Sequence, residues 1–426
     1  MNKEKKSIMD RLLDVSMKIQ SNKYIQAISS GFAALMPLII VGALFAVVDS
    51  IGIPAYQNFL VDTGIKSFLR FPNMVTNGML SIYVAFSIAY NLATLHKLDA
   101  FMTGLVSIMA FLILQPFSLN AEGADVIRVG LLGAEGVFTA IVVAILVFIC
   151  SRFLIQHNIY IRMPAGVPEM VERSFKALTS VAFVMLLFLI IKIAVSFTSF
   201  GTFPDLIAAV VQAPLKLLGG NLISFVIIIS IVNLLWFFGI HGHLVALSIM
   251  TPVYLQMDLE NLTNFQANLP MENILGNAFI YIYCSGCCVL AGLVFWLWRA
   301  KTQRFKSVAK LSLIPALFGI GEPLCFGIPY VFNFTLLIPV VFSGVINALL
   351  AYAATAMNIL PRLNGLNISG VPVGVGGFLA GGLAVGLFQL FLCVVNIIFY
   401  APFMKKLDQI EYEKEKAAAE AEAASV

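Results

Sequence analysis

The sequence predicts an all-α protein that crosses a membrane about ten times, and two observations support this prediction. Hydrophobic residues make up 60% of the chain and charged residues only 11%, whereas a soluble domain has roughly 25% charged residues. Several runs without a charge, among them 24–48, 71–95 and 273–298, exceed the roughly 20 residues that a helix needs to cross a bilayer. We therefore expect a multi-pass protein in a lipid bilayer, with no nucleic-acid partner.

The first half is expected to form one domain, residues 24–200, after an amphipathic N-terminal segment at 1–23. Crossings are predicted at about 24–48, 71–95, 100–119, 136–150 and 178–199. Lys192, in the fifth crossing, is expected to reach the interface, and the alternative is a partner inside the bundle. Basic residues collect on the cytoplasmic side of membranes. The lysine-rich N-terminus and the basic loop at 152–176 are therefore placed inside.

The second half is expected to begin with an amphipathic connector at 201–218 and to continue as a domain at 219–404. Residues 217–257 contain no Asp, Glu, Lys or Arg, and this run is too long for one crossing. We predict a crossing to about Phe238 and a second element that either crosses or re-enters. The loop at 299–310 has five basic residues and no acid. This loop is expected in the cytoplasm, which favours a crossing at 241–257.

The remaining elements complete the count of ten. A re-entrant hairpin is predicted at 311–331, and further crossings at 273–298, 332–357 and 378–400. A glycine-rich loop at 361–377 is expected to dip toward the hairpin. The tail at 405–426 is predicted to be a solvated helix or disordered. Both termini are then cytoplasmic.

Glu322 is the residue around which the second half is organised. Across residues 311–404 it is one of only two charged residues, and Arg362 is the other. A carboxylate at membrane depth is unfavourable unless it faces a protein-lined cavity or a partner. Gly321 and Pro323 predict that a helix is interrupted here, with Pro323 opening a new half-helix that Glu322 caps. We predict a binding site; the alternative is a structural carboxylate that pairs with Arg362.

Two of the four histidines are candidates for ligand contact. His96 and His157 fall in predicted loops and are expected to face water. His241 and His243 lie at the break in the long apolar run, just after Trp236. Two histidines two residues apart do not share a helix face, and no His-Glu-x-x-His motif is present, so a zinc protease is disfavoured. We predict that His241 donates to a polar ligand and that His243 either supports it or packs in the core.

Aromatic and amide side chains supply the other candidates. Trp236 is of a type that more often faces lipid or the core, yet an aromatic ring can also stack on the apolar C–H face of a sugar. Asn277 and Asn333 can hydrogen-bond hydroxyl groups or bridge neighbouring helices. Gly321 and Pro323 complete the predicted surroundings of the ligand.

No metal or cofactor is expected. The six cysteines, Cys-x-x-Cys-Cys at 284–288 included, all lie in apolar segments, where we interpret them as packing residues and not as metal ligands. No Gly-x-x-x-x-Gly-Lys-Ser/Thr phosphate loop occurs, so ATP hydrolysis by this chain is not expected.

The motifs together resemble those of a known family. They are Gly239-Ile-His-Gly242 after an aromatic run, Gly321-Glu-Pro323 followed by Phe326-Gly-Ile-Pro329, and Pro361-Arg-Leu-Asn-Gly365. In this order the chain resembles, over residues 1–404, the membrane-embedded EIIC component of the bacterial phosphoenolpyruvate-dependent sugar phosphotransferase system (PTS). Its lactose/cellobiose/diacetylchitobiose branch is the most similar. Two positions depart from that branch: Gly321 stands where Asn is usual, and Gly381-Gly-Leu-Ala384 replaces an acidic Gly-Asp-Trp-Arg-like turn.

The resemblance implies an elevator-type fold in a bacterial cell membrane. It implies a homodimer formed by the first five helices, with a second half that holds the sugar and moves across the membrane. It also implies a His and a Glu near the sugar C6 hydroxyl, which are His241 and Glu322 here. The implied phosphoryl donor is a phosphocysteine on a separate cytoplasmic EIIB protein, and EIIA is the further partner.

The predicted function is therefore a sugar permease that couples uptake to phosphorylation at C6, with a β-linked disaccharide such as cellobiose, diacetylchitobiose or lactose as substrate. Glu322 and His241 are the predicted catalytic residues. One alternative is an ion-coupled transporter in which Glu322 is the ion site, and it predicts release of unmodified sugar. A second is an intramembrane hydrolase or acyltransferase that uses His241 and Glu322, and it predicts turnover without a second protein.

Overall fold

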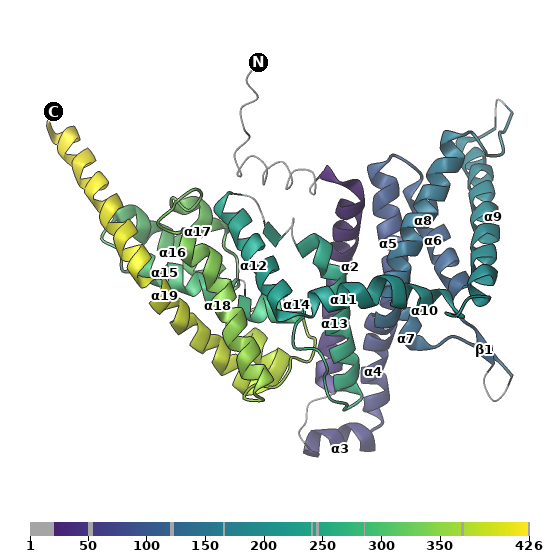
Figure 1. Cartoon of the computed structure of the whole chain (residues 1–426), viewed down its shortest axis with the longest axis horizontal. Helices are drawn as coiled ribbons and strands as arrows, with labels where there is room; N and C mark the ends of the chain where they lie inside the picture. Colours follow the sequence, from purple (N-terminus) through teal and green to yellow (C-terminus); the bar gives the residue numbers. More distant parts are fainter. Residues whose placement is uncertain are drawn as a thin grey trace. The chain divides into compact units, whose positions relative to one another are not determined.

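The computed structural model is almost entirely helical and divides into two compact units (Figure 1). It describes residues 21–49, 54–119, 123–164, 167–239, 242–243, 247–284, 286–367 and 370–424. The first unit comprises Met1–Leu217 with Thr251–Gln256, and the second comprises Leu218–Met250 with Met257–Val426. The division falls at the end of the expected connector. The amphipathic segment expected at 1–23 lies almost wholly outside the described residues.

The first unit is a helical bundle built around α5 (Leu80–Leu95), which packs against α2, α6 and α8. Small residues on α5, such as Ala85 and Ala89, are fully buried and allow the close helix approach that membrane bundles use. The other elements are α2 (Lys23–Asp49), α3 (Pro54–Asp62), α4 (Ile65–Val75), η1 (Asn77–Met79), α6 (Ala100–Leu114), β1 (Ser118–Leu119), β2 (Asp125–Val126), α7 (Val129–Leu132), η2 (Ala134–Gly136), α8 (Val137–Gln156), α9 (Glu169–Ser196), α10 (Phe203–Ile207), η3 (Ala208–Gln212) and α11 (Ala213–Gly219). β1 and β2 pair antiparallel.

Lys192 has a partner within the first unit. Its Nζ donates to the carbonyl of Gln115 at 2.8 Å and lies 5.0 Å from the ring centroid of Phe117. Gln115 is the C-cap of α6, and a cation is favourable at that end of a helix. The contact favours the alternative that Lys192 pairs inside the bundle over the expectation that Lys192 extends to the membrane interface.

The second unit contains two neighbouring groups of helices. α15 packs against α16 and α19, and α12 packs against α18. Its elements are α12 (Leu222–Phe237), α13 (Ser248–Gln266, partly assigned to the first unit), α14 (Asn277–Phe279), the π-turn η5 (Ile280–Cys284), α15 (Cys287–Trp298), α16 (Gln303–Leu317), α17 (Glu322–Gly327), α18 (Leu337–Ala356) and α19 (Val375–Ala424). α19 is bent where Gly381 and Gly382 leave helical geometry.

Seven described helices are long and apolar enough to cross a membrane, or eight if the bent pair Phe203–Leu217 and Leu222–Phe237 counts as one further span. The multi-pass prediction is therefore consistent with the structure, while ten crossings remain a prediction. One predicted crossing that is not among these helices is α6, which is apolar but shorter than the others. α13 is another: the element expected at 241–257 begins at Ser248, runs to Gln266 and includes Asp258 and Glu260.

One expectation about a loop needs correction, and of the two alternatives for the C-terminal tail the structure has the helical one. The basic segment at 299–310 is not a loop, because α16 begins at Gln303 and includes most of it. Lys, Arg and Gln are good helix formers, and acidic side chains from α19 satisfy the first amides of this helix. The tail at 405–426 is helical through Ala424, as a continuation of α19.

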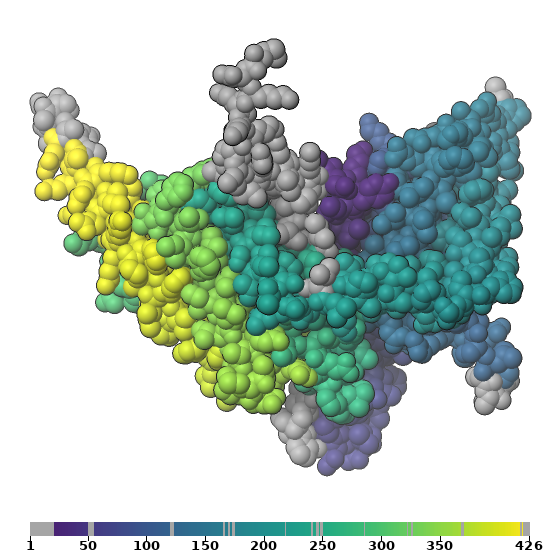
Figure 2. All heavy atoms as spheres, in the orientation of Figure 1, coloured from purple at the N-terminus to yellow at the C-terminus, as the bar shows by residue number. Residues whose placement is uncertain are grey.

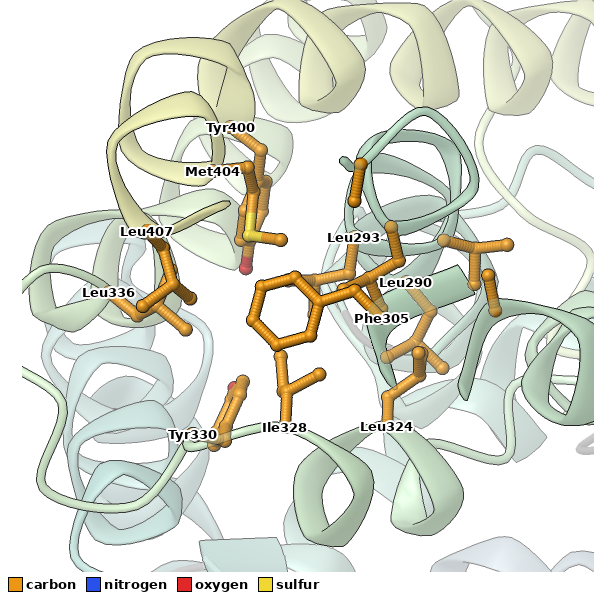
Figure 3. Packing of buried hydrophobic residues seen from close by; sticks show 14 of the residues in the cluster. Leu290, Leu293, Phe305, Leu324, Ile328, Tyr330, Leu336, Tyr400, Met404 and Leu407 are labelled. Atoms are coloured by element: carbon orange, nitrogen blue, oxygen red, sulfur yellow. The ribbon is translucent and has the colours of Figure 1, made fainter. Parts of the chain in front are cut away.

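Side chains from six helices, α12 and α15 to α19, form a buried core in the second unit (Figure 3). Leu290 and Leu293 of α15, Leu324 of α17 and Met404 of α19 surround Phe305 of α16, whose side chain is fully buried. Each buried apolar side chain of this size contributes roughly 1.5–3 kcal/mol. The core therefore joins α16 and the short helix α17 to α15 and α19.

Candidate functional site

Glu322 is the first residue of α17, directly after the turn that ends α16. The predicted interruption of the helix is confirmed, with one difference in its cap. Gly321 is the N-cap and Pro323 lies in the first turn, where its missing N–H leaves no intrahelical bond unmade. The side chain of Glu322 lies outside the described part of the structure, so its predicted role remains a prediction. Arg362, its suggested partner, is exposed and donates to the carbonyl of Met271 at 2.6 Å.

One hydrogen bond closes the turn of the hairpin, and another joins its two arms at the opposite end. At the turn, the amide of Ile320 donates to the carbonyl of Pro315 at 2.9 Å. At the other end, Nη2 of Arg304 donates to the carbonyl of Gly327, the last residue of α17, at 3.2 Å. The C-terminal end of α17 is therefore attached to the first turn of α16, and Leu324 of α17 packs in the same core as Phe305 of α16.

Three interrupted segments of the second unit meet at the hairpin turn. A Cβ added to Gly286, at the break between η5 and α15, would lie 3.2 Å from the Cα of Gly319 in the turn, so only glycine permits this approach. The thiol of Cys287 donates to the carbonyl of Leu317 at 3.2 Å. The same carbonyl accepts from the amide of Val373 at 3.0 Å. The 361–377 loop thus contacts the end of α16, and its expected approach to the binding site remains a prediction.

The broken helix of α14, η5 and α15 is supported by amide side chains from distant helices. A π-turn releases backbone groups from the regular helical pattern, and irregular backbone at membrane depth needs other partners. Here Nδ2 of Asn347 donates to the carbonyl of Tyr283 at 2.8 Å, and Nε2 of Gln389 donates to that of Ile282 at 3.1 Å. Asn396 in turn donates to Oδ1 of Asn347 at 2.9 Å. These residues hold the break in place.

Asn277 opens this broken helix and is buried. Asp258, a buried carboxylate on α13, accepts from the amide of Ala278 at 2.9 Å and from the amide of Asn277. A carboxylate at a helix N-terminus is favourable. Asp258 could not be predicted from the sequence, because it follows the long uncharged run directly and lies in no local motif.

Trp236 and His243 are brought together. Nε1 of Trp236 donates to Nδ1 of His243 at 3.2 Å, a contact that fits both alternatives for His243, so its role remains a prediction. His241 lies outside the described residues. The same end of α12 contacts the chain that follows the hairpin, since the amide of Phe332 donates to the carbonyl of Phe237 at 3.0 Å.

Asn333 has local partners for both ends of its amide. Its Nδ2 donates to the carbonyl of Pro329 at 2.6 Å, and its Oδ1 accepts from the amide of Thr335 at 3.0 Å. These bonds stabilise the turn into α18. Of the alternatives for Asn333, they favour a structural role over ligand contact.

The second unit therefore offers a turn lined by interrupted backbone, with Gly321, Glu322 and Pro323 at its centre. Among the described residues, no group of three or more His, Cys, Asp or Glu side chains is placed to hold a metal ion. Backbone groups freed at a helix break can hydrogen-bond a polar ligand.

Comparisons with known proteins agree with this architecture. A family model described as "Phosphotransferase system, EIIC" matches residues 29–344. The chain is 31% identical to an oligo-beta-mannoside-specific EIIC component of Bacillus subtilis (strain 168), covering 97% of this chain and 96% of that one. It is also 31% identical to a cellobiose-specific EIIC component of Geobacillus stearothermophilus, with 96% and 95% coverage.

A solved structure extends the similarity to the fold. It is that of the transporter ChbC, the IIC component of an N,N'-diacetylchitobiose-specific phosphotransferase system. The two chains are 30% identical, the match covers 95% of this chain and 98% of the other, and the TM-score is 0.89. The arrangement of helices described above is therefore shared almost along the whole chain.

Proposed function

The chain belongs to the EIIC family of the phosphotransferase system, and from this premise we propose that it binds a β-linked disaccharide and translocates it while the sugar is phosphorylated at C6. The family makes it a multi-pass membrane sugar permease that works with EIIB and EIIA proteins. The observation that carries the proposal is the α16–α17 hairpin, which presents Glu322 at a turn where three interrupted segments meet.

The substrate class comes from the relatives. They are specific for cellobiose and for oligo-beta-mannosides, and the solved relative is specific for N,N'-diacetylchitobiose. A disaccharide of this kind presents hydroxyl groups to hydrogen-bonding side chains and an apolar face to an aromatic ring. Trp236, which His243 holds by a hydrogen bond, is our candidate for that ring, and Asn277 for a hydroxyl contact.

The proposed reaction transfers a phosphoryl group from a cysteine of EIIB to the sugar. The sugar C6 oxygen attacks phosphorus, a P–O bond forms, the S–P bond breaks, and the EIIB thiolate leaves. Glu322 accepts or orients the proton of the C6 hydroxyl during this attack, and His241 holds the same hydroxyl. A positioned base contributes roughly 10²–10⁴-fold to such a step, and the remainder comes from positioning.

The first unit is proposed to form a homodimer, and the second to move as an elevator that carries the sugar. Both termini are proposed to be cytoplasmic. The exposed basic residues of α16, such as Arg304 and Lys310, then face the compartment from which EIIB arrives.

One reconstitution tests the proposal. Membranes that contain the chain are supplied with EIIB, EIIA, the general phosphotransfer proteins, phosphoenolpyruvate and labelled cellobiose, diacetylchitobiose or lactose. We expect phosphorylated sugar inside the vesicles, and uptake that persists when ion gradients are collapsed. Uptake of unmodified sugar that depends on an ion gradient would establish the transporter alternative. Turnover without EIIB would establish the hydrolase.

The orientation is tested by labelling residue 307. Ser307 is exposed on α16, within the basic segment that is expected in the cytoplasm. A Ser307→Cys substitution in a cysteine-free background should react with an impermeant thiol reagent only in inside-out vesicles. Reaction from outside intact cells would contradict this orientation and the count of ten crossings.

The cysteines of this chain are not expected to take part in phosphoryl transfer. A phosphoryl-carrying cysteine must be an exposed thiolate, whereas Cys284 and Cys288 are buried and Cys287 donates to a backbone carbonyl. Replacing all six with Ser or Ala should lower stability by roughly 1–3 kcal/mol at most and leave sugar phosphorylation intact. A folded, sugar-binding cysteine-free protein that cannot support phosphorylation would place a cysteine of this chain in the relay.

A further inference from the structure

Acidic side chains from the far end of α19 cap the N-terminus of α16. Asp408 accepts from the amide of Lys301 at 2.8 Å and from the amide of Thr302 at 3.1 Å. The Thr302 hydroxyl makes no cap bond to its own helix and donates instead to Oδ1 of Asp408 at 2.7 Å. Glu415 accepts from the amide of Gln303 at 3.1 Å. These amides have no partner inside the helix, and negative charge is favoured at this end.

The segment that carries Asp408 is firmly packed. Met404 and Leu407 lie on one face of α19 and are buried in the core with Phe305 (Figure 3). Asp408 follows Leu407 directly, and Glu415 lies seven residues further along, on the same face of the helix. Figures 1 and 2 show α19, in yellow, running along the green helices of the second unit. The buried residues of α19 therefore help to fix the position of the acidic side chains that cap α16.

The capped helix is the first arm of the hairpin that carries Glu322. Arg304, in the first turn of α16, donates to the carbonyl of Gly327 at the end of α17. Leu324 and Ile328 pack with Phe305 in the same core. A displacement of the α16 N-terminus is consequently transmitted to α17, whose first residue is Glu322.

We propose that Asp408 and Glu415 are positioning residues for phosphoryl transfer, because they fix α16 and thereby hold the hairpin in the geometry that the reaction needs. They touch neither the sugar nor the reacting atoms. The inference rests on the proposed function. The inference gives a role to the C-terminal tail, for which no chemical role is predicted from the sequence. It also connects the basic segment that faces EIIB with the sugar site.

The test compares Asp408→Ala, and its combination with Glu415→Ala, with a control on the same helix. The control is Glu413→Ala, because Glu413 is exposed on another face of the helix and its described hydrogen bond is to Gln409 one turn away. With saturating phospho-EIIB and cellobiose, we expect kcat to fall by about tenfold or more, with the Kd for sugar changed by no more than about twofold. The control should match the wild type. Asp408→Asn, which keeps an acceptor oxygen, should lie between them.

Amide hydrogen exchange supplies a readout that a purely local cap would not change. We expect faster exchange across residues 318–327 in Asp408→Ala, and unchanged exchange in α18. A variant that melts at a lower temperature but keeps the wild-type kcat and the slow exchange of 318–327 would overturn the inference, because Asp408 would then be only a structural cap. A wild-type chain that phosphorylates no sugar would overturn the proposed function instead, and the exchange rates would still decide whether Asp408 holds the hairpin.

Discussion

Glu322→Gln is expected to abolish most sugar phosphorylation while the protein stays folded. The substitution keeps the shape of the side chain and removes its charge and its capacity to accept a proton. Loss of one charged hydrogen bond of roughly 1.5–3 kcal/mol weakens sugar binding by about tenfold to a hundredfold. Loss of a positioned base lowers the rate by roughly 10²-fold or more. Titration with cellobiose and the reconstituted phosphorylation assay measure the two effects separately.

A control for this variant comes from the first unit. Glu135 forms an exposed ion pair with Arg128, and exposed pairs contribute roughly 0–1 kcal/mol. Glu135→Gln should therefore leave folding, sugar binding and phosphorylation unchanged. Normal phosphorylation by Glu322→Gln would remove Glu322 from the mechanism and leave it as a structural residue.

The sequence predicts most of the helices because their signal is local. Long uncharged runs place α2 and α12 within a few residues and predict the existence of α8, α9 and α18 with larger errors at one end, since each helix needs a length set by the bilayer. The break before Glu322 was also predictable, because Gly319, Gly321 and Pro323 lie together there and such a cluster disfavours a continuous helix. Predictions from hydropathy differ from the structure at α13, which is polar, and at α6, which is short.

The support of the site could not be predicted in the same way, because its partners are distant in sequence. Asn347 and Gln389 each look like isolated amides in an apolar helix, and only the folded chain brings them to the carbonyls of Tyr283 and Ile282. Asp408 similarly reaches an amide more than a hundred residues away. No spacing rule in one sequence relates such residues, so pairings of this kind emerge only with the fold.

The 361–377 loop gives the last prediction, that Gly365→Ala severely destabilises the second unit. Gly365 has φ +80, and a Cβ there would lie 1.9 Å from the carbonyl oxygen of Asp258 and 3.0 Å from the amide nitrogen of Leu262. The positive φ alone destabilises alanine by roughly 1–2 kcal/mol. Overlap with the backbone of α13 cannot be relieved by a rotamer change, so we expect a total above about 4 kcal/mol and a loss of folded protein in detergent.

Gly370 is the matched control, because it lies in the same loop with φ +75 and, among the described residues, no atom lies within 4 Å of an added Cβ. Gly370→Ala should therefore show only the conformational penalty of roughly 1–2 kcal/mol and should remain folded. Thermal denaturation followed by size-exclusion chromatography compares the two variants directly. Equal stability of the two variants would contradict the close contact between Gly365 and the backbone of α13. A much lower stability of Gly365→Ala would support the close packing of this loop on α13, beside the carboxylate that caps the broken helix.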